Sequence, residues 1–324
     1  MVLIKINKEK ASLLKQNLSL SVSMRNYVSF FFLSFCLLWS SFEPCESKSW
    51  IWQGALMANS IRFRAKTDEL EFRLVAVSNS ENSSVVFARV ITEAEFVDVA
   101  FQETNTDWNN NSTRVIDLVF EDLKQDTTYT WSATGGLEGR FHTPKKSGSP
   151  FNFTFAFASC ADNDSNHNLF SFIPTHLDPL FFVHLGDLHY GNLHENNILH
   201  YSRMLDRTLT QVNQASLFHN LPTVYMWDDH DYGPNNADKW NPGRPAAMKM
   251  YRMFVPSYQL GTKNSEGPVY HSFIIGRVLF VVTDTSSERD PQNETTLGDE
   301  QLTWFLEKLR FIYKKPEYYI IWVK

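Results

Sequence analysis

The chain has 324 residues, of which 43% are hydrophobic, so it is long enough for two domains or one large one around a sizeable core. Its 30 Lys and Arg residues stand against 36 Asp and Glu residues, which gives a formal net charge of −6. Nucleic-acid binding needs a basic surface that neutralises phosphates, so this balance argues against that class.

Residues 1–47 are predicted to form an N-terminal extension with a secretory signal. The basic start Met24-Arg25 precedes an apolar run of about 13 residues, from Tyr27 to Trp39, and small or polar residues follow up to Ser47. The run is too short for a comfortable membrane span, so we expect no stable span in the mature chain. Two alternatives are that translation begins at Met24 and that the long form acts as an anchor. In each case the chain is predicted to enter the secretory pathway and to reach the extracellular space or the cell surface.

Glycosylation sequons, which belong on the surface of secreted proteins, support this compartment weakly. The candidate acceptors are Asn82, Asn110, Asn111, Asn152 and Asn293. Cleavage near Ser47 would leave Cys160 as the only cysteine, and a lone thiol is unusual in an oxidising compartment. Cys160 is either a buried inert side chain or a metal ligand, and its neighbours favour the ligand.

Residues 50–143 alternate short β-like runs with polar turns, which predicts a small β-sandwich. The runs are 61–65, 71–77, 84–90, 115–120 and 128–132. Residues 123–129, followed by Trp131, resemble the late-strand corner of fibronectin type III and immunoglobulin-like modules. The segment carries no cluster of metal-binding side chains, so we expect a structural or substrate-shaping module.

A polar, turn-rich linker at 144–150 precedes a second domain at 151–324, where strands alternate with helices. Strands are predicted at 151–158, 180–185, 223–227, 270–275, 278–283 and 317–324, and helices at 195–218, 246–254 and 299–312. This alternation predicts a layered α/β domain with its site in loops at strand ends. In the last helix an apolar stripe at helical spacing is predicted to be core: Leu302, Phe305, Leu306, Leu309 and Ile312. A domain that stops inside a strand is expected to be truncated at its C-terminus.

Metal-binding side chains follow three of the predicted strands. Cys160 follows the first, Asp187 and Tyr190 follow the second, and the third leads into residues 228–231 (Asp-Asp-His-Asp) and then Asn235. Carboxylate, thiolate, phenol, imidazole and amide donors together are typical of a two-metal hydrolytic site. Such cations also make an acidic protein compatible with a small phosphate-ester substrate.

Asp187 is the best candidate for a carboxylate that bridges two cations, because the glycine before it allows a sharp exit from the strand. The run Asp228-Asp229-His230-Asp231 would be strongly repulsive without cations, although a solvated acidic loop is the alternative. Such loops seldom follow an apolar strand directly. Ser159 lacks a convincing His and Asp partner set, so a serine hydrolase has little support.

Together these motifs resemble the PhoD-like alkaline phosphatases, a branch of the metallophosphoesterases. The resemblance rests on residues 158–160 (Ala-Ser-Cys), 186–190 (Gly-Asp-Leu-His-Tyr) and 227–231 (Trp-Asp-Asp-His-Asp). Residues 283–285 and 297–301 match a later strand and helix of that family, so the likeness covers about residues 150–324.

The resemblance implies a four-layer α/β metallophosphatase domain that binds iron (Fe³⁺) and calcium (Ca²⁺). Cys160, Asp187 and Tyr190 would hold the iron, Asp187 would bridge to calcium, and Asp229 and Asn235 would complete the calcium site. His230 would lie against the substrate phosphate, so that His230 and Asp187 are the catalytic candidates. A metal-held hydroxide would attack phosphorus in line, with phosphate monoesters as the first substrate class and diesters as the second.

One departure from the family leaves two functions open. The family carries a further Asp/His ligand motif beyond the point where this chain ends. The last histidine of this chain is His271. The chain is therefore either part of a secreted metallophosphatase or a catalytically inactive short form that acts as a binding or interaction protein. A dimetal nuclease is disfavoured by the acidic charge, and nothing in the sequence indicates an oligomeric state.

Overall fold

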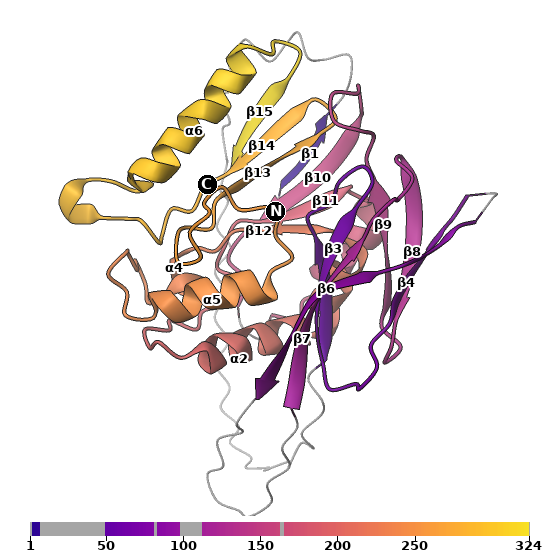
Figure 1. Cartoon of the computed structure of the whole chain (residues 1–324), viewed down its shortest axis with the longest axis horizontal. Helices are drawn as coiled ribbons and strands as arrows, with labels where there is room; N and C mark the ends of the chain where they lie inside the picture. The colour runs from indigo at the N-terminus through magenta and orange to yellow at the C-terminus, as the bar shows by residue number, and fades with distance from the viewer. Residues whose placement is uncertain (1, 7–48, 81–82, 98–111, 163–164, 324) are drawn as a thin grey trace, which may run out of the picture.

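The computed structural model describes residues 2–6, 49–80, 83–97, 112–162 and 165–323 (Figure 1). It contains an all-β part and a mixed α/β part that lie side by side. The predicted signal segment and the sequons at Asn82, Asn110 and Asn111 lie outside the described residues. None of the helices in the described ranges combines the length and the apolar character needed to cross a membrane.

The all-β part consists of two antiparallel four-stranded sheets. The first has the order β2-β3-β7-β6, with β2 Trp50–Gly54, β3 Ile61–Thr67, β7 Ser112–Phe120 and β6 Arg89–Val97. The second has the order β5-β4-β8-β9, with β5 Val85–Phe87, β4 Leu74–Ser78, β8 Thr127–Ala133 and β9 Glu138–Thr143. Phe63 of the first sheet packs edge-on against Trp131 of the second, with ring centroids 5.4 Å apart. The closer likeness to fibronectin type III or immunoglobulin modules stays a prediction.

The predicted strand at 84–90 is in fact two strands. β5 pairs with β4 in one sheet, and β6 pairs with β7 in the other. The break falls at Ala88, whose backbone N–H donates to Leu74 O at 2.9 Å. The segment 84–90 therefore carries the chain from one sheet to the other, a change that the alternation of residue types does not reveal.

The α/β part is built on two further sheets that face each other. One has the order β1-β10-β11-β12, with β1 Val2–Ile6, β10 Phe153–Ala158, β11 Phe181–His184 and β12 Thr223–Tyr225. The other has the order β13-β14-β15, with β13 His271–Ile275, β14 Val278–Val282 and β15 Tyr319–Val323. The Phe280 ring lies 5.3 Å from Phe155 and 5.4 Å from Phe181, so phenylalanines fill the space between the sheets.

Strands β10, β11 and β12 are parallel, as the predicted alternation with helices requires. Strand β1 pairs antiparallel with β10, although the sequence placed residues 2–6 in the N-terminal extension. The carboxyl ends of the three parallel strands meet at one edge of the sheet. The loops that begin at residues 159, 185 and 226 leave from that edge.

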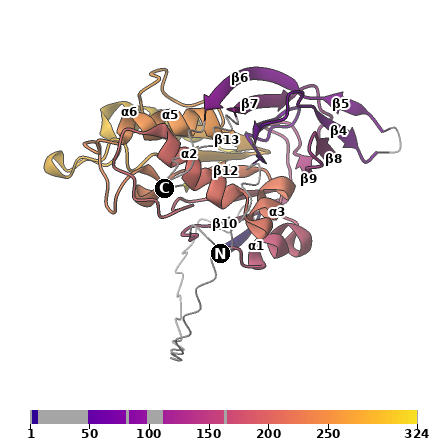
Figure 2. The same ribbon diagram turned by 90° about the horizontal axis from the view of Figure 1, so that it is seen from below.

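Helices surround these sheets (Figures 1 and 2). They are α1 Leu169–Phe172, the π-helical turn η1 Ile173–Leu177, α2 Ile198–Leu209, α3 Val212–Asn220, α4 Asp229–Tyr232, α5 Arg244–Phe254, the 3-10 turn η2 Pro291–Asn293 and α6 Gly298–Tyr313. The predicted helix at 195–218 is two helices, because the backbone of Gln211 is extended, with φ −65° and ψ 125°.

The prediction that the α6 stripe is core is wrong. Leu302, Leu306 and Leu309 are 44%, 42% and 39% exposed. The helix instead packs beside β15, where Phe305 lies 5.4 Å from Trp322 (Figure 1). Helical periodicity identifies an apolar face but cannot say whether another element covers it.

Candidate metal centre

The loop after β10 is held by backbone hydrogen bonds to the loop after β11. Cys160 adopts a left-handed conformation, with φ 63°, and its N–H donates to Gly186 O at 3.1 Å. The next N–H, of Ala161, donates to Asp187 O at 2.8 Å. Cys160 and Asp187 are therefore brought together by the backbone itself. Their side chains meet as well, with Cys160 Sγ 3.6 Å from Asp187 Oδ2.

Gly186 allows the loop after β11 to touch the loop after β12. Its φ is +95°, which favours glycine, and a Cβ at this position would lie 2.4 Å from Asp228 N. Asp187, the next residue, is also left-handed, with φ 52°. The sharp exit from β11 that the sequence predicted is thus present, and it turns the Asp187 carboxylate toward the third loop.

Asp231 joins the second and third loops from beneath. Its side chain is completely buried; Oδ1 accepts from His189 N at 3.1 Å and Oδ2 accepts from Asp228 N at 3.0 Å. The second bond is part of a capping box at the start of α4. Burial raises the pKa of Asp231 well above its ordinary value. This residue is therefore a cross-loop clamp, because its two oxygens accept from backbone N–H groups of two different loops.

Trp227 fixes the third loop to the second sheet. Its indole Nε1–H donates to Asp284 Oδ1 at 2.9 Å, and Asp284 is fully buried just after β14. Gln301 of α6 accepts from Asp284 N at 2.7 Å and donates to Asp284 O at 2.8 Å. The acidic loop thus rests on a chain of buried hydrogen bonds that reaches α6.

The second and third loops bring Asp187, Asp229 and His230 together, with one possible ligand atom of each within 4.8 Å of the others. The Asp187 side chain is buried, and among the described residues its Oδ1 has no hydrogen-bond partner. A buried carboxylate oxygen without a donor is costly, and a cation would remove that cost. These side chains therefore fit a metal ion, as the sequence predicted for this edge of the sheet.

Tyr190 and Cys160 both lie against the Asp187 side chain. Burial, the hydrogen bond to Cys160 and the charge of Asp187 all raise the pKa of Tyr190 above its usual value. The Tyr190 ring lies 4.5 Å from the His230 ring. Cys160 is exposed, which excludes the alternative that it is an inert buried thiol.

Two side chains near the centre behave differently from a simple ligand. Asn192 was not assigned a role from sequence, yet its Oδ1 lies 2.6 Å from His230 Nδ1 and so orients that imidazole. Asn235, the predicted calcium ligand, is exposed, and it is the backbone N–H of Asn236 that donates to Asp229 Oδ2. The ligand role of Asn235 remains a prediction.

Beneath the centre, His184 and His189 are buried imidazoles. Burial lowers the pKa of His184 to about 3 and that of His189 to about 4, so both are neutral at physiological pH. His189 Nδ1 lies 3.9 Å from Asp231 Oδ1. The histidine next to the predicted Asp187 motif therefore supports the loops from below.

Comparisons with known proteins agree with this arrangement. A family model described as PhoD-like phosphatase matches residues 155–321. A structure of PhoD is similar, with a TM-score of 0.59 and 18% identity, over 82% of this chain and 61% of that one. A structure of the purple acid phosphatase PPD1 from yellow lupin (Lupinus luteus) seeds is also similar, with a TM-score of 0.50 and 14% identity, over 85% of this chain and 50% of that one. At these identities the two structures show a shared mixed α/β fold. A search of curated proteins gave no match.

Proposed function

Because the chain belongs to the PhoD-like phosphatase family, we propose that it is a metal-dependent phosphoesterase that hydrolyses small phosphate monoesters, with diesters as the second substrate class. The observation that carries the proposal is the convergence of Asp187, Asp229 and His230 within 4.8 Å. Asp187 comes from the loop after β11, and Asp229 and His230 come from the segment after β12, both at the carboxyl edge of a parallel sheet, where α/β proteins usually bind ligands.

Two cations suit these donors, and we propose iron and calcium. Cys160, Asp187 and Tyr190 would hold the iron, because thiolate and phenolate favour a transition metal. Asp187, Asp229 and Asn235 would hold the calcium, which prefers oxygen donors. When bound, the cations would supply an acidified water for attack on phosphorus and positive charge for the phosphoryl oxygens.

The protein's own part is positioning. Asp187 and Asp229 bring negative charge to the place where a phosphate ester would bind, so the ester is repelled until cations compensate the two carboxylates. Asn192 Oδ1 accepts from His230 Nδ1, which fixes the imidazole plane. The other ring nitrogen, Nε2, would then be the atom that contacts a phosphoryl oxygen and helps to hold the group in line.

The chain spans 61% of the length of the PhoD structure, so its activity as a phosphatase is part of the proposal. Secretion is part of it too, and a fusion of residues 1–60 to a reporter enzyme would test it. Export of the reporter is expected. Retention in the cytosol would contradict this part alone.

The decisive experiment measures metal content and hydrolysis in the same sample. The purified chain is loaded with Fe³⁺ and Ca²⁺, analysed by elemental analysis, and assayed with p-nitrophenyl phosphate and its bis ester. Asp187→Asn is expected to lose at least about 100-fold in rate while remaining folded. The control is Asp178→Asn, whose carboxylate is 77% exposed and remote from the three loops. A metal-loaded protein without hydrolysis would reject the enzyme and favour the inactive binding form.

A further inference from the structure

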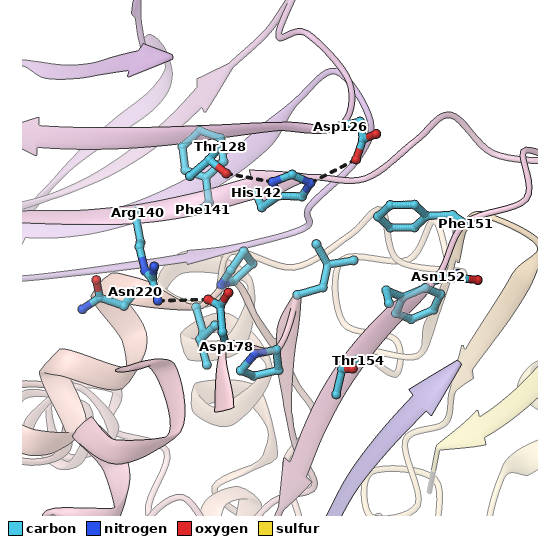
Figure 3. A pocket seen from close by; sticks show the side chains of 15 residues that line it. Asp126, Thr128, Arg140, Phe141, His142, Phe151, Asn152, Thr154, Asp178 and Asn220 are labelled. Carbon is cyan, nitrogen blue, oxygen red and sulfur yellow. Dashed lines mark hydrogen bonds and ion pairs between the residues drawn. The ribbon is translucent and has the colours of Figure 1, made fainter. Parts of the chain in front are cut away.

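A second site is suggested by a cavity at the opposite edge of the β10-β11-β12 sheet from the metal centre. Its volume is about 410 Å³, and it is open to solvent between the all-β part and the α/β part (Figure 3). Thr154 near the start of β10 and Leu180 and Pro222 just before β11 and β12 line it on one side. Thr128 and His142 line it from β8 and β9. Ligand sites often lie where two structural units meet, and the volume suits a small ligand.

The charged side chains in the cavity wall already have partners. Arg140 Nη2 donates to Asp178 Oδ1 at 3.0 Å and to Pro174 O at 2.6 Å. Asp126 lies 3.3 Å from His142 Nε2 and 3.5 Å from Lys145 Nζ. Because each carboxylate has a cationic or hydrogen-bonding neighbour, neither an anion nor a cation would meet an uncompensated charge. The cavity therefore suits a neutral ligand.

The remaining lining combines hydrogen-bonding and apolar groups. The wall carries the amide side chains of Asn152 and Asn220 and the hydroxyl groups of Thr128 and Thr154, and the ring of Phe151 is partly exposed beside them (Figure 3). Thr128 Oγ1 already lies 2.9 Å from His142 Nδ1, and Asn220 Nδ2 donates to Ser216 O at 2.9 Å. Amide and hydroxyl oxygens can accept more than one hydrogen bond, so acceptor capacity remains for a ligand. A neutral ligand with hydroxyl groups on its edge and C–H groups on its faces matches such a wall. An N-acetylhexosamine has both, and its acetamido group adds an amide and a methyl group.

Asn152 indicates how an N-acetylhexosamine could reach the cavity. It is exposed and begins the sequon Asn152-Phe153-Thr154 at the cavity wall. We propose that the cavity is a binding site for an N-acetylhexosamine and that the first sugar of an N-linked glycan on Asn152 occupies it. A free saccharide of the same kind is the other source. The glycan would bridge the all-β part and the start of the parallel sheet.

The experiment compares glycosylated and unglycosylated protein. The full chain is secreted from a eukaryotic host for glycopeptide mass spectrometry, and it is made in bacteria for titration with N-acetylglucosamine and its β1,4 dimer by calorimetry. Thr128→Trp is the cavity-filling variant and leaves the sequon intact. Thr130→Trp is its control, because Thr130 is an exposed residue two positions along β8 that does not line the cavity.

We expect a glycan on Asn152, and we expect its enzymatic removal to lower the Tm of the wild type by roughly 2–4 °C. Thr128→Trp should abolish that difference and weaken binding of the free dimer at least about tenfold, whereas Thr130→Trp should change neither. If the dimer binds but Asn152 carries no glycan, the cavity is a saccharide site whose ligand is a free saccharide. A glycan whose removal changes nothing, together with no binding of either sugar, would overturn the proposal.

Discussion

Replacing Asp231 by asparagine tests whether the cross-loop clamp organises the metal centre. In the native protein the two carboxyl oxygens accept separate backbone hydrogen bonds, from His189 N at 3.1 Å and from Asp228 N at 3.0 Å. The amide of Asp231→Asn keeps one acceptor and places an NH₂ group against the other N–H. One hydrogen bond is lost, and one buried backbone donor is left without a partner.

Each of these changes has a known scale. A buried donor left unsatisfied costs about 1–3 kcal/mol, so we expect Asp231→Asn to lower the free energy of unfolding by about 2 kcal/mol. The two backbone groups precede Tyr190 on one loop and Asp229 on the other. A loosened clamp should therefore weaken metal binding by about 10–100-fold, the usual effect of losing a partner behind the ligands.

Calcium titration by calorimetry at 25 °C, on samples shown by circular dichroism to be folded, measures the loss of metal affinity separately from the loss of stability. Thr143→Val is a suitable control because it also removes a buried hydrogen-bonding group, and so should lower the free energy of unfolding by a similar amount, far from the site. The Thr143 hydroxyl is buried, donates to Lys124 O at 2.6 Å and accepts from Thr127 N at 3.0 Å. We expect the control to lose stability and to keep wild-type calcium affinity. Wild-type affinity in Asp231→Asn would refute the clamp.

Three further predictions address other parts of the site and the fold. Gly186→Ala should cost about 2–4 kcal/mol because its Cβ would lie 2.4 Å from a backbone nitrogen; Gly135→Ala, with a similar φ and nothing within 4 Å, should cost only about 1 kcal/mol in urea unfolding. Cys160→Ser should lower iron content and leave calcium content unchanged in elemental analysis. Burial lowers the pKa of His271 from 6.5 to about 4, so its neutral form contributes stability above pH 6.5 that is lost as the pH falls toward 4. His271→Gln should remove about 2 kcal/mol of the destabilisation measured between pH 7.5 and pH 5, and an unchanged pH profile would contradict this.

The sequence was sufficient to place the candidate site at one edge of the sheet. Apolar runs that end in polar donors mark buried strands, and parallel strands bring their carboxyl ends together. For this reason Asp187, Asp229 and His230 could be grouped although Asp229 follows Asp187 by 42 positions along the chain. The geometry of the loops follows from local chemistry, because Gly186 before Asp187 is itself a signal for a sharp turn.

The supporting residues could not be predicted in the same way. Asp284 supports Trp227 from 57 positions away, and Asn192 reaches His230 across 38 positions. Their side chains match common structural aspartates and loop asparagines, and only the fold gives them their partners. The error at α6 has the same cause. The apolar stripe at Leu302, Leu306 and Leu309 is present, but the sequence does not show whether another element packs against it.

The way the centre is held also explains how mutually repulsive groups can share one place. Asp187 and Asp229 are not fixed by bonds between their own carboxylates, which would favour separation in the absence of cations. They are fixed by the backbone: Cys160 N and Ala161 N bond the second loop, and Asp231 bonds the second loop to the third. Ordinary hydrogen bonding and burial during folding therefore offset the repulsion between the assembled carboxylates. A cation then gains the full electrostatic attraction of an arranged site, since it need not order the loops itself.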